Sequence, residues 1–394
     1  MNIKSILIAG ILAIALIAMG FLANRDSGSQ AADASAGQLV LPGLFDSIND
    51  VSELLVKTTD GEFHVKRQGE TWVLTEKDGY PIDVNNVRST LVSLAEIKTV
   101  EEKTSNPDRH VQLGVQSVGA NPQSDTQSKQ VDLLDSSGET IASLILGKTR
   151  SGGGGKTFYV RRPSEMASWL VEGTLPELPD SGDTWLDKKI VEFKRDDMRA
   201  VRTTHADGEV LTISKTDEDK EFTVHDMPAE RELTYAAVAG GIAGALQYMN
   251  FEDVMKFESF EAPGDPVAVS SFWTKDGLRL NVKIWEQDEK TLAAFEAAYD
   301  MDGAPTIAAG PMPEPEEGEA LAVASPRPQA EVEAEASELN ARLSAWIFEI
   351  PTYSKTNLTK RMDGLLKPLP EPEEEAEPDL DLDAPIDIDS LGGE

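Results

Sequence analysis

The sequence predicts an α+β protein with two tandem copies of an antiparallel β-sheet and packed helix, preceded by one N-terminal transmembrane helix. Three observations predict this architecture. A long uncharged apolar stretch opens the chain, Asp-Gly hairpin signals recur through the body, and the order of strand and helix signals repeats. Repetition of a whole supersecondary pattern is typical of a duplicated domain.

The N-terminal stretch is uncharged from Ser5 to Asn24, which predicts a membrane anchor over residues 1–25. Its twenty residues would span about 30 Å as a helix, which matches a bilayer core. Lys4 precedes the stretch, so the positive-inside bias predicts a cytoplasmic N-terminus and a periplasmic body, held at the inner membrane. A cleaved signal peptide is the competing interpretation. It would need a shorter apolar core and a nearer cleavage site than "ASA" at Ala34 to Ala36.

The first predicted copy covers residues 51–180 and follows a tether over residues 26–50. Asp60-Gly61 and Ser137-Gly138 each separate two strand-like runs, which is a hairpin signal. Between these hairpins, Asp83 is a predicted N-cap. The helix that it begins has four apolar positions on one face: Val84, Val87, Leu91 and Leu94.

The second predicted copy covers residues 198–366, after a linker over 181–197. Hairpins are predicted about Asp207-Gly208 and Asp276-Gly277, with a helix between them in "RELTYAAVAGGIAGALQYM". That helix has an apolar face made of Val238, Ile242, Leu246 and Met249. A disordered acidic insertion is predicted over 303–328. It is followed by a helix in "AEVEAEASELNARL", a strand in "SAWIFEIP" and a last helix in "TYSKTNLTKRMDGLL".

The composition excludes several classes of function. The 394 residues include no cysteine, which removes disulfides, thiolate metal sites, cysteine nucleophiles and the acylated cysteine of a bacterial lipoprotein. The net charge of -34 argues against a nucleic-acid partner. Much of that charge lies in the predicted disordered tail over residues 367–394, where Glu371 to Glu394 contains eleven acids and no base.

Three segments together resemble the bacterial family called domain of unknown function 4340. They are "LILGKTRSGGGGKTFYVRRPSEMASWLVEG", "TWLDKKIVEF" and "AWIFEIPTYSKTNLTKRMDGLL", and the resemblance extends over about Val51 to Leu366. The resemblance implies a membrane helix followed by a repeated β-rich body. It also implies a gene beside an ABC-2-type permease and a gliding-motility-like auxiliary subunit, and hence an accessory role to a transporter. It brings no catalytic residues to this chain.

The glycine run in "RSGGGGKTFYV" invites comparison with a phosphate-binding loop. In the Walker pattern that ends at Gly155-Lys156-Thr157, the first glycine would stand where the chain has Arg150. The residues that follow are β-prone, whereas a phosphate loop leads into a helix. We therefore expect no nucleotide and interpret the run as a strand connection. Its cations Lys148, Arg150 and Lys156 are candidate partner contacts.

Other motifs favour structural interpretations. The histidines are His64, His110, His205 and His225, and their spacing predicts exposed strand residues and no metal site. The tail segment Asp379–Asp389 departs from the calcium-loop pattern and is interpreted as a solvated tail, with strand addition to a partner as the alternative. No cofactor and no catalytic residue is expected.

Three glycines in the predicted second helix are the other candidate partner contacts: Gly240, Gly241 and Gly244. Each glycine costs about 1 kcal/mol relative to alanine inside a helix. Either the helix approaches its own sheet closely at these positions, or the glycines offer a smooth surface to a partner helix such as a permease segment.

The sequence thus favours a non-enzymatic, membrane-anchored periplasmic subunit that acts through protein contacts, with an ABC-2-type permease or auxiliary subunit as partner. The alternative is a cell-envelope module that binds polysaccharide or peptidoglycan through Trp169, Trp185 and Trp273. A hydrolase is a distant third.

Deletion of Gly152–Gly155 is expected to leave the fold intact, because the run only connects two strands. Circular dichroism and thermal unfolding of the deletion variant check this. A large fall in the unfolding temperature would show that the loop is structural.

Overall fold

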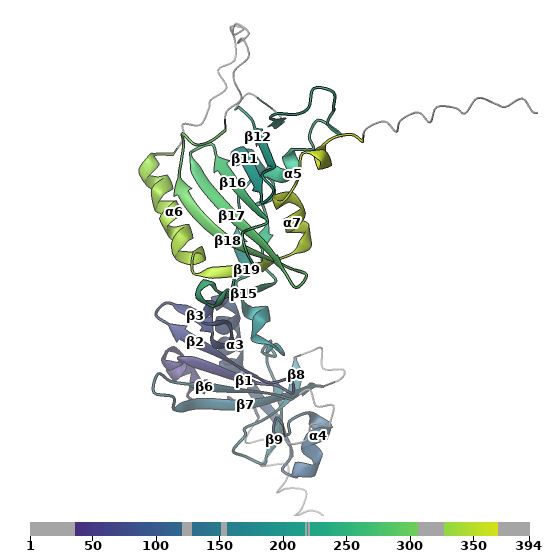
Figure 1. Cartoon of the computed structure of the whole chain (residues 1–394). Helices are drawn as coiled ribbons and strands as arrows, with labels where there is room; N and C mark the ends of the chain where they lie inside the picture. The colour runs from purple at the N-terminus through teal and green to yellow at the C-terminus, as the bar shows by residue number, and fades with distance from the viewer. Residues whose placement is uncertain are drawn as a thin grey trace, which may run out of the picture. The chain divides into compact units, whose positions relative to one another are not determined.

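The computed structural model describes residues 36–119, 128–150, 156–216, 219, 221–305 and 327–368. It has α+β architecture, with large antiparallel sheets and few helices (Figure 1). The predicted anchor over residues 1–25 lies outside the described residues. Within them, no helix is both long enough and apolar enough to cross a membrane.

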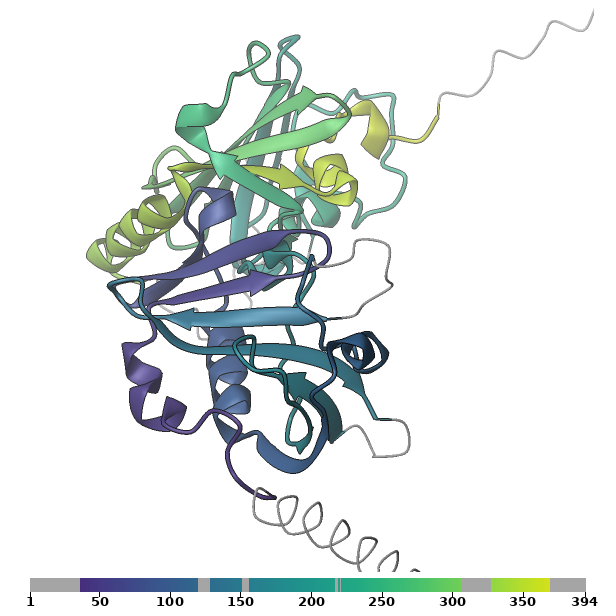
Figure 2. The ribbon, with the colours of Figure 1, turned by 90° about the horizontal axis from the view of Figure 1, so that it is seen from below.

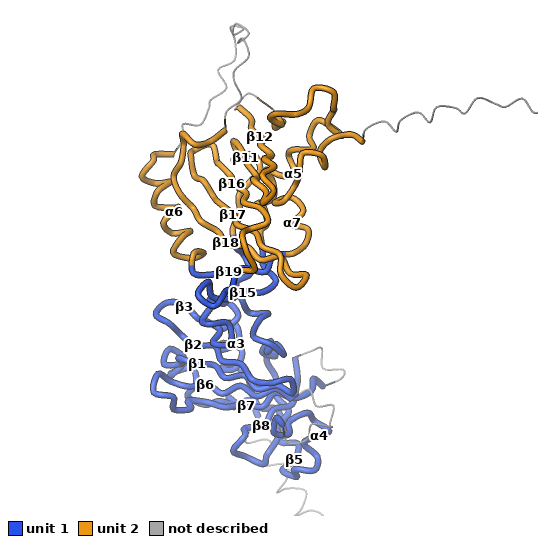
Figure 3. Tube along the Cα trace, in the orientation of Figure 1, with its two compact units in different colours: residues 1–190, 250–261, 345–350 blue, residues 191–249, 262–344, 351–394 orange. Residues whose placement is uncertain are grey.

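The chain divides into two compact units (Figure 3). Unit 1 contains residues 1–190, 250–261 and 345–350, and unit 2 contains residues 191–249, 262–344 and 351–394. Two short strands, β10 (Lys189–Val191) and β14 (Met249–Asn250), lie where the chain passes from one unit to the other. Each unit is therefore assembled from segments that are distant in sequence.

Unit 1 is built on a nine-stranded antiparallel sheet with the order β4-β3-β2-β1-β6-β7-β8-β9-β5. The strands are β1 (Glu53–Lys57), β2 (Glu62–Gln68), β3 (Thr71–Leu74), β4 (Tyr80–Pro81), β5 (Lys98–Thr104), β6 (Lys129–Leu134), β7 (Thr140–Thr149), β8 (Thr157–Arg161) and β9 (Ser168–Glu172). The predicted hairpins about Asp60-Gly61 and Ser137-Gly138 are present as β1–β2 and β6–β7. Alternating burial along β1 follows from the period of two that directs neighbouring side chains to opposite faces.

Helix α3 (Val84–Glu96) begins where the sequence predicts, because the Asp83 side chain accepts a hydrogen bond of 2.9 Å from the backbone N–H of Asn85. Its buried face includes Val87, Leu91 and Leu94, while Val84 is exposed. This face packs against the sheet (Figure 2). Two further helices of unit 1 are short: α2 (Leu44–Ser47) and α4 (His110–Leu113).

An aromatic cluster joins the later segments of unit 1 to its first part. The Tyr80 ring makes edge contacts with Phe251, Trp346 and Phe348, at centroid distances of 5.2, 4.9 and 6.1 Å. Trp346 and Phe348 belong to β19 (Trp346–Ile350), which pairs antiparallel with β15 (Asp253–Lys256). Burial of these rings stabilises the packing of residues 250–261 and 345–350 in unit 1.

Unit 2 contains the strand order β13-β12-β11-β16-β17-β18. These strands are β11 (Met198–His205), β12 (Val210–Ser214), β13 (Thr223–Val224), β16 (Ala268–Thr274), β17 (Leu278–Gln287) and β18 (Lys290–Tyr299). The predicted hairpins about Asp207-Gly208 and Asp276-Gly277 are present. Helix α6 (Gln329–Leu343) lies along β18, where the Asn340 side chain bonds both the N–H and the C=O of Ala297.

The prediction of one long helix over residues 231–249 is wrong. Only α5 (Gly240–Ala243) is α-helical, and tight turns with i to i+3 hydrogen bonds surround it. Gly240, Gly241 and Gly244 weaken the helix enough for these shorter turns to replace it. The last predicted helix is also shorter than expected, with α7 ending at Leu358 (Thr352–Leu358).

Candidate functional site

The glycine run connects two paired strands, as the sequence predicts. β7 and β8 are antiparallel partners with Leu146 opposite Val160, and the N–H of Arg150 donates to the carbonyl of Thr157 at 2.9 Å. A phosphate loop would lead from a strand into a helix, so this connection has the wrong geometry for nucleotide binding. Residues 151–155 lie outside the described residues.

Beside this connection, unit 1 has a groove with a volume of about 820 Å³. Both polar side chains and apolar residues line it, and they come from the β1–β2 turn, α3, β6, β7 and the segment after β9. The lining residues are Thr59, Asp60, Asn86, Lys129, Leu146, Gly147, Lys148, Thr149, Leu175, Pro176, Glu177, Leu178, Pro179, Asp180, Thr184 and Trp185. The volume lies in the range of sites that bind small ligands or a few residues of a peptide.

One wall of the groove is fixed by Lys129. Its ammonium group donates to the Leu178 carbonyl at 2.6 Å and forms an ion pair of 2.8 Å with Asp180. The hydroxyl of Thr58 donates to the carbonyl of Asp180 at 3.4 Å. The ammonium group of Lys129 is therefore paired within the protein, and it holds the segment that contains Pro176 and Pro179 in place.

The predicted contact residue Lys148 lines the groove and is half-buried, whereas Arg150 and Lys156 are exposed next to it. Among the described residues, none of these three cations has a carboxylate partner. Lys148 therefore adds a positive charge to a groove that Asp60, Glu177 and Asp180 also line, and Arg150 and Lys156 stand next to it in the chain. A partner that brings a carboxylate or another acceptor would satisfy these cations.

Gly147 shapes the strand that presents Lys148. The pairing of β7 with β8 shifts between Leu146 and Thr149, which marks a β-bulge. A Cβ atom at Gly147 would lie 2.5 Å from the Leu113 carbonyl and 2.6 Å from Val115 Cγ1. Only glycine lets the chain after α4 approach the strand this closely.

A buried arginine also holds the chain after α4 in place. Arg161 is 4 % exposed and donates to the carbonyls of Val115, Pro163 and Glu165 at 2.8, 3.2 and 3.0 Å, and to the Ser117 hydroxyl at 3.0 Å. Burial lowers its pKa from the ordinary value. These bonds fasten two loops to the end of β8.

His110, also buried, belongs to the same cluster. Its Nε2 donates to the Met166 carbonyl at 2.9 Å. Burial lowers the pKa of His110 below the ordinary 6.5, the Met166 hydrogen bond opposes that change, and the Arg161 charge lowers the pKa further. The lowered pKa favours the neutral form of His110 in the folded protein.

The prediction of exposed strand histidines is wrong, because none of the four is exposed: His64 and His225 are half-buried, and His225 lies after β13. His110 lies on α4 and is 4 % exposed, and His205 is 5 % exposed on β11. His64 contacts Glu53 at 2.7 Å, and His225 Nε2 lies 2.7 Å from the Ser214 hydroxyl. The two residues of each contact are 11 positions apart in sequence. The sequence does not reveal these contacts, because they depend on the register of the paired strands.

Serine and histidine together invite comparison with a hydrolase. Ser214 is 2 % exposed on β12, and His225 has no carboxylate partner among the described residues. A catalytic base needs such an orienting group, and an accessible nucleophile must face a substrate site. Among the described residues, no group of three or more histidine or acidic residues is arranged to hold a metal ion.

The burial of Trp185 and Trp273 does not fit the tryptophan platform of the envelope-binding alternative. Trp185 and Trp273 are 5 % and 4 % exposed and belong to different units, so they contribute to separate cores. Trp169 on β9 is half-buried. A stacking site for sugars needs exposed ring faces, which Trp185 and Trp273 lack.

The other candidate contacts, Gly240, Gly241 and Gly244, lie in and next to α5. Gly240 is buried, and its added Cβ would lie 3.2 Å from the Arg195 guanidinium. Gly241 is exposed, with Asn357 Oδ1 3.7 Å from its added Cβ. Gly240 thus accommodates a neighbour within unit 2, while Gly241 remains open to solvent.

Comparison with known proteins supports the predicted family. Residues 72–268, which make up half of the chain, match the family model described as "Domain of unknown function (DUF4340)". The match is shorter than the resemblance expected from the sequence and includes β6, β7, β8 and β9. No curated protein matches the chain significantly.

Gly147→Ala is expected to destabilise unit 1 by about 1–3 kcal/mol, because the added methyl overlaps the Leu113 carbonyl. Urea denaturation of the purified protein measures this. Gly241→Ala is the matched control, since its Cβ meets only Asn357 Oδ1 at 3.7 Å. Equal stability of the two variants would show that the close approach at Gly147 does not constrain the fold.

His110 is expected to make the protein less stable as the pH falls below about 6.5. Below that pH the unfolded chain binds a proton at His110, while the folded protein, with its lowered pKa, does not. The free energy of unfolding therefore falls as the pH decreases from about 6.5 to the lowered pKa of the folded state. Unfolding temperatures between pH 5 and pH 8 check this. His110→Gln is expected to flatten the profile in that window, and an unchanged slope would contradict the assignment.

Proposed function

Because this chain belongs to the DUF4340 family, we propose that it is a non-enzymatic membrane-anchored subunit of an ABC-type transport or envelope system. It acts by holding a partner protein, with a permease or auxiliary subunit of the transporter as that partner. The groove of unit 1, with Lys148 in its lining, carries this proposal. The apolar stretch from Ser5 to Asn24 supports an inner-membrane anchor and a periplasmic body.

A binding role fits the groove better than catalysis does. Lys148, Arg150 and Lys156 supply positive charge, and Lys129 is engaged by Asp180. The hydroxyl and amide groups of Thr59, Asn86 and Thr149 suit the backbone of an extended peptide. We infer that an extended segment of the partner, carrying at least one carboxylate, lies in the groove.

The topology supports a duplication of the body. The order β3-β2-β1-β6-β7-β8 in unit 1 corresponds strand for strand to β13-β12-β11-β16-β17-β18 in unit 2. The helical segment follows β4 in unit 1 and β13 in unit 2. After that segment, β5 pairs with β9 in the first predicted copy, and β15 pairs with β19 in the second. We propose that the two copies arose in tandem and that the first became the partner-binding copy.

Lys148→Glu combined with Lys156→Glu is expected to reduce recovery of the partner at least tenfold in affinity purification from detergent-solubilised membranes. The reversal places like charges opposite the partner's carboxylate. Arg88→Glu combined with Lys188→Glu is the control, since it makes the same change in net charge at exposed positions of unit 1 outside the groove.

Recovery of the permease with the control variant but not with the groove variant, at unchanged unfolding temperatures, supports the proposal. Equal recovery of the partner with both variants contradicts it. Purification of the wild-type protein without any permease or auxiliary subunit argues against the transporter role itself.

A further inference from the structure

A segment of unit 1 that follows β9, residues 178–182, crosses the ends of neighbouring strands in a fixed order. Lys129, at the start of β6, donates to the Leu178 carbonyl at 2.6 Å. Thr58, which follows β1, donates through its hydroxyl to the Asp180 carbonyl at 3.4 Å. Two carbonyls that are two residues apart thus meet two adjacent strands, so the segment passes β6 first and β1 second.

Unit 2 contains the same kind of crossing after helix α7. The Ser270 hydroxyl on β16 donates to the Leu358 carbonyl, and the His205 ring at the end of β11 donates through Nε2 to the Lys360 carbonyl at 3.3 Å. β16 and β11 correspond to β6 and β1 in the order of the strands. The two crossings therefore have the same direction and the same spacing of two residues.

The residue after the second bound carbonyl differs between the two units. It is Ser181 in unit 1 and Arg361 in unit 2. The Arg361 guanidinium pairs with Asp207 at 2.8 Å and also with Glu209. Both acids lie in the turn between β11 and β12, so the crossing segment of unit 2 supplies a cation to the turn that it passes.

The corresponding turn of unit 1 has the same acids without a cation. Its sequence, Asp60-Gly61-Glu62 between β1 and β2, repeats Asp207-Gly208-Glu209. Among the described residues, no basic side chain pairs with the carboxylate of Asp60 or Glu62. Ser181 has no charge to offer them. Two positions that hold a guanidinium in unit 2 are therefore left open in unit 1.

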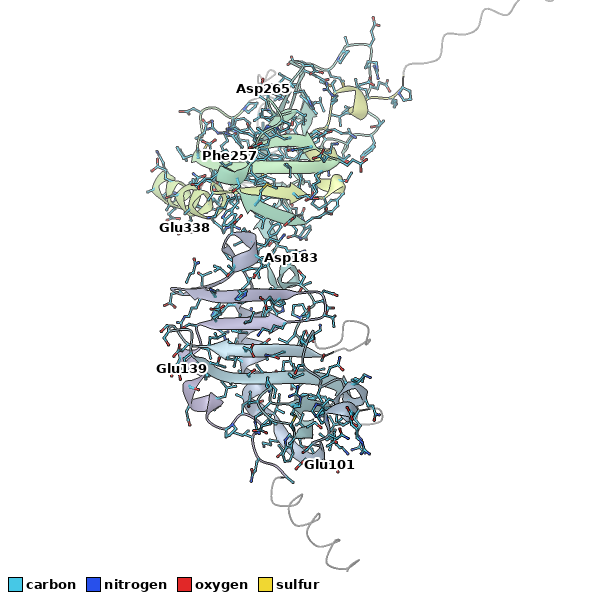
Figure 4. All side chains as sticks on the ribbon, turned by 60° about the horizontal axis from the view of Figure 1, so that its bottom comes forward. Glu101, Glu139, Asp183, Phe257, Asp265 and Glu338 are labelled. Carbon is cyan, nitrogen blue, oxygen red and sulfur yellow. The ribbon has the colours of Figure 1, made fainter. Side chains whose placement is uncertain are left out.

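Unit 1 also has room for the missing group, because Asp60, Glu62 and Ser181 line one hollow of about 260 Å³. The other acids of the hollow have partners: Glu76 accepts from the His64 N–H at 3.0 Å, Asp180 pairs with Lys129 at 2.8 Å, and Asp183, labelled in Figure 4, pairs with Lys77 at 3.6 Å. Asp60 and Asp180 line the groove as well, so the hollow lies directly beside it.

We propose that this hollow binds an arginine side chain of the partner segment that lies in the groove. The inference rests on the proposed function of the groove. The partner's guanidinium takes the place that Arg361 takes in unit 2, with Asp60 and Glu62 as its acceptors. A guanidinium suits two separate carboxylates because its N–H donors point in several directions. Among the described residues, no group of three or more histidine or acidic residues is arranged to hold a metal ion instead.

The hollow narrows the chemistry of the partner segment. Lys148 at the end of β7 calls for an acid, and Asp60 after β1 calls for a base. One strand, β6, lies between β7 and β1, so the two sites are separated by about 10 Å, or about three residues of an extended peptide. The partner segment therefore carries an arginine and an acid a few residues apart, and a purely acidic segment does not fit.

Ser181→Arg is expected to restore within unit 1 the pair that unit 2 has. In the full chain in detergent, its unfolding temperature is expected to lie about 1–3 °C above that of Ser181→Gln, which has a similar length and no charge. The difference should disappear when Asp60→Asn and Glu62→Gln are added to both variants, because no carboxylate then receives the guanidinium. Equal unfolding temperatures of Ser181→Arg and Ser181→Gln would overturn the proposal.

The same substitution is expected to compete with the partner's arginine. In affinity purification from detergent-solubilised membranes, Ser181→Arg should lower recovery of the partner about threefold or more. Ser181→Gln and Ser136→Arg should keep the wild-type recovery. Ser136→Arg is the matched control, since it adds the same charge at an exposed serine outside the groove and the hollow.

Recovery of the partner with Ser181→Arg at the wild-type level would overturn the proposal and leave the proposed function intact. An equal loss of the partner with Ser181→Gln would also overturn it, because the size of the side chain rather than its charge would then decide. Purification of the wild-type protein without a partner would refute the proposed function and the partner's arginine together. The unfolding temperatures would still show whether the hollow accepts a guanidinium.

Discussion

The close approach of the α4 loop to strand β7 is the constraint on which the rest of unit 1 depends. Gly147 provides the space, and the buried guanidinium of Arg161 supplies the bonds that hold the loop in it. A buried charge is costly unless its donors are satisfied. Here backbone carbonyls satisfy them, so the local chain path is specified by hydrogen-bond geometry. The bulge that results turns Lys148 into the groove.

Local sequence signals predicted the elements that local physics determines. Asp60-Gly61, Asp207-Gly208 and Asp276-Gly277 fix hairpins because glycine tolerates the turn, and Asp83 caps its helix with its own side chain. The helix expected around Ile242 failed for a local reason too. Its three glycines disfavour a continuous helix, and the segment adopts tight turns around α5 instead.

The candidate site was predictable only in part. Lys148, Arg150 and Lys156 stand out because they are cations in an acidic chain, and their position beside a strand connection follows from the β-prone residues around them. The opposite wall was not predictable. Lys129 and Asp180 are far apart in sequence, and their ion pair exists only because the segment after β9 returns to the ends of β1 and β6. The burial of His110 likewise depends on the Met166 carbonyl, which no sequence pattern connects to it.

Residues 37–40 pair antiparallel with the beginning of β5 through three backbone hydrogen bonds, and this attachment has a mechanical consequence. A pull on residue 36 along the direction of residues 37–40 loads the three backbone hydrogen bonds together, in shear. A segment attached end-on would lose its bonds one after another under the same load. The two hydrogen bonds from the Arg162 guanidinium to the Val40 carbonyl add a further restraint at the end of this segment. Tension from the N-terminal side is therefore transmitted to the whole sheet before the attachment yields.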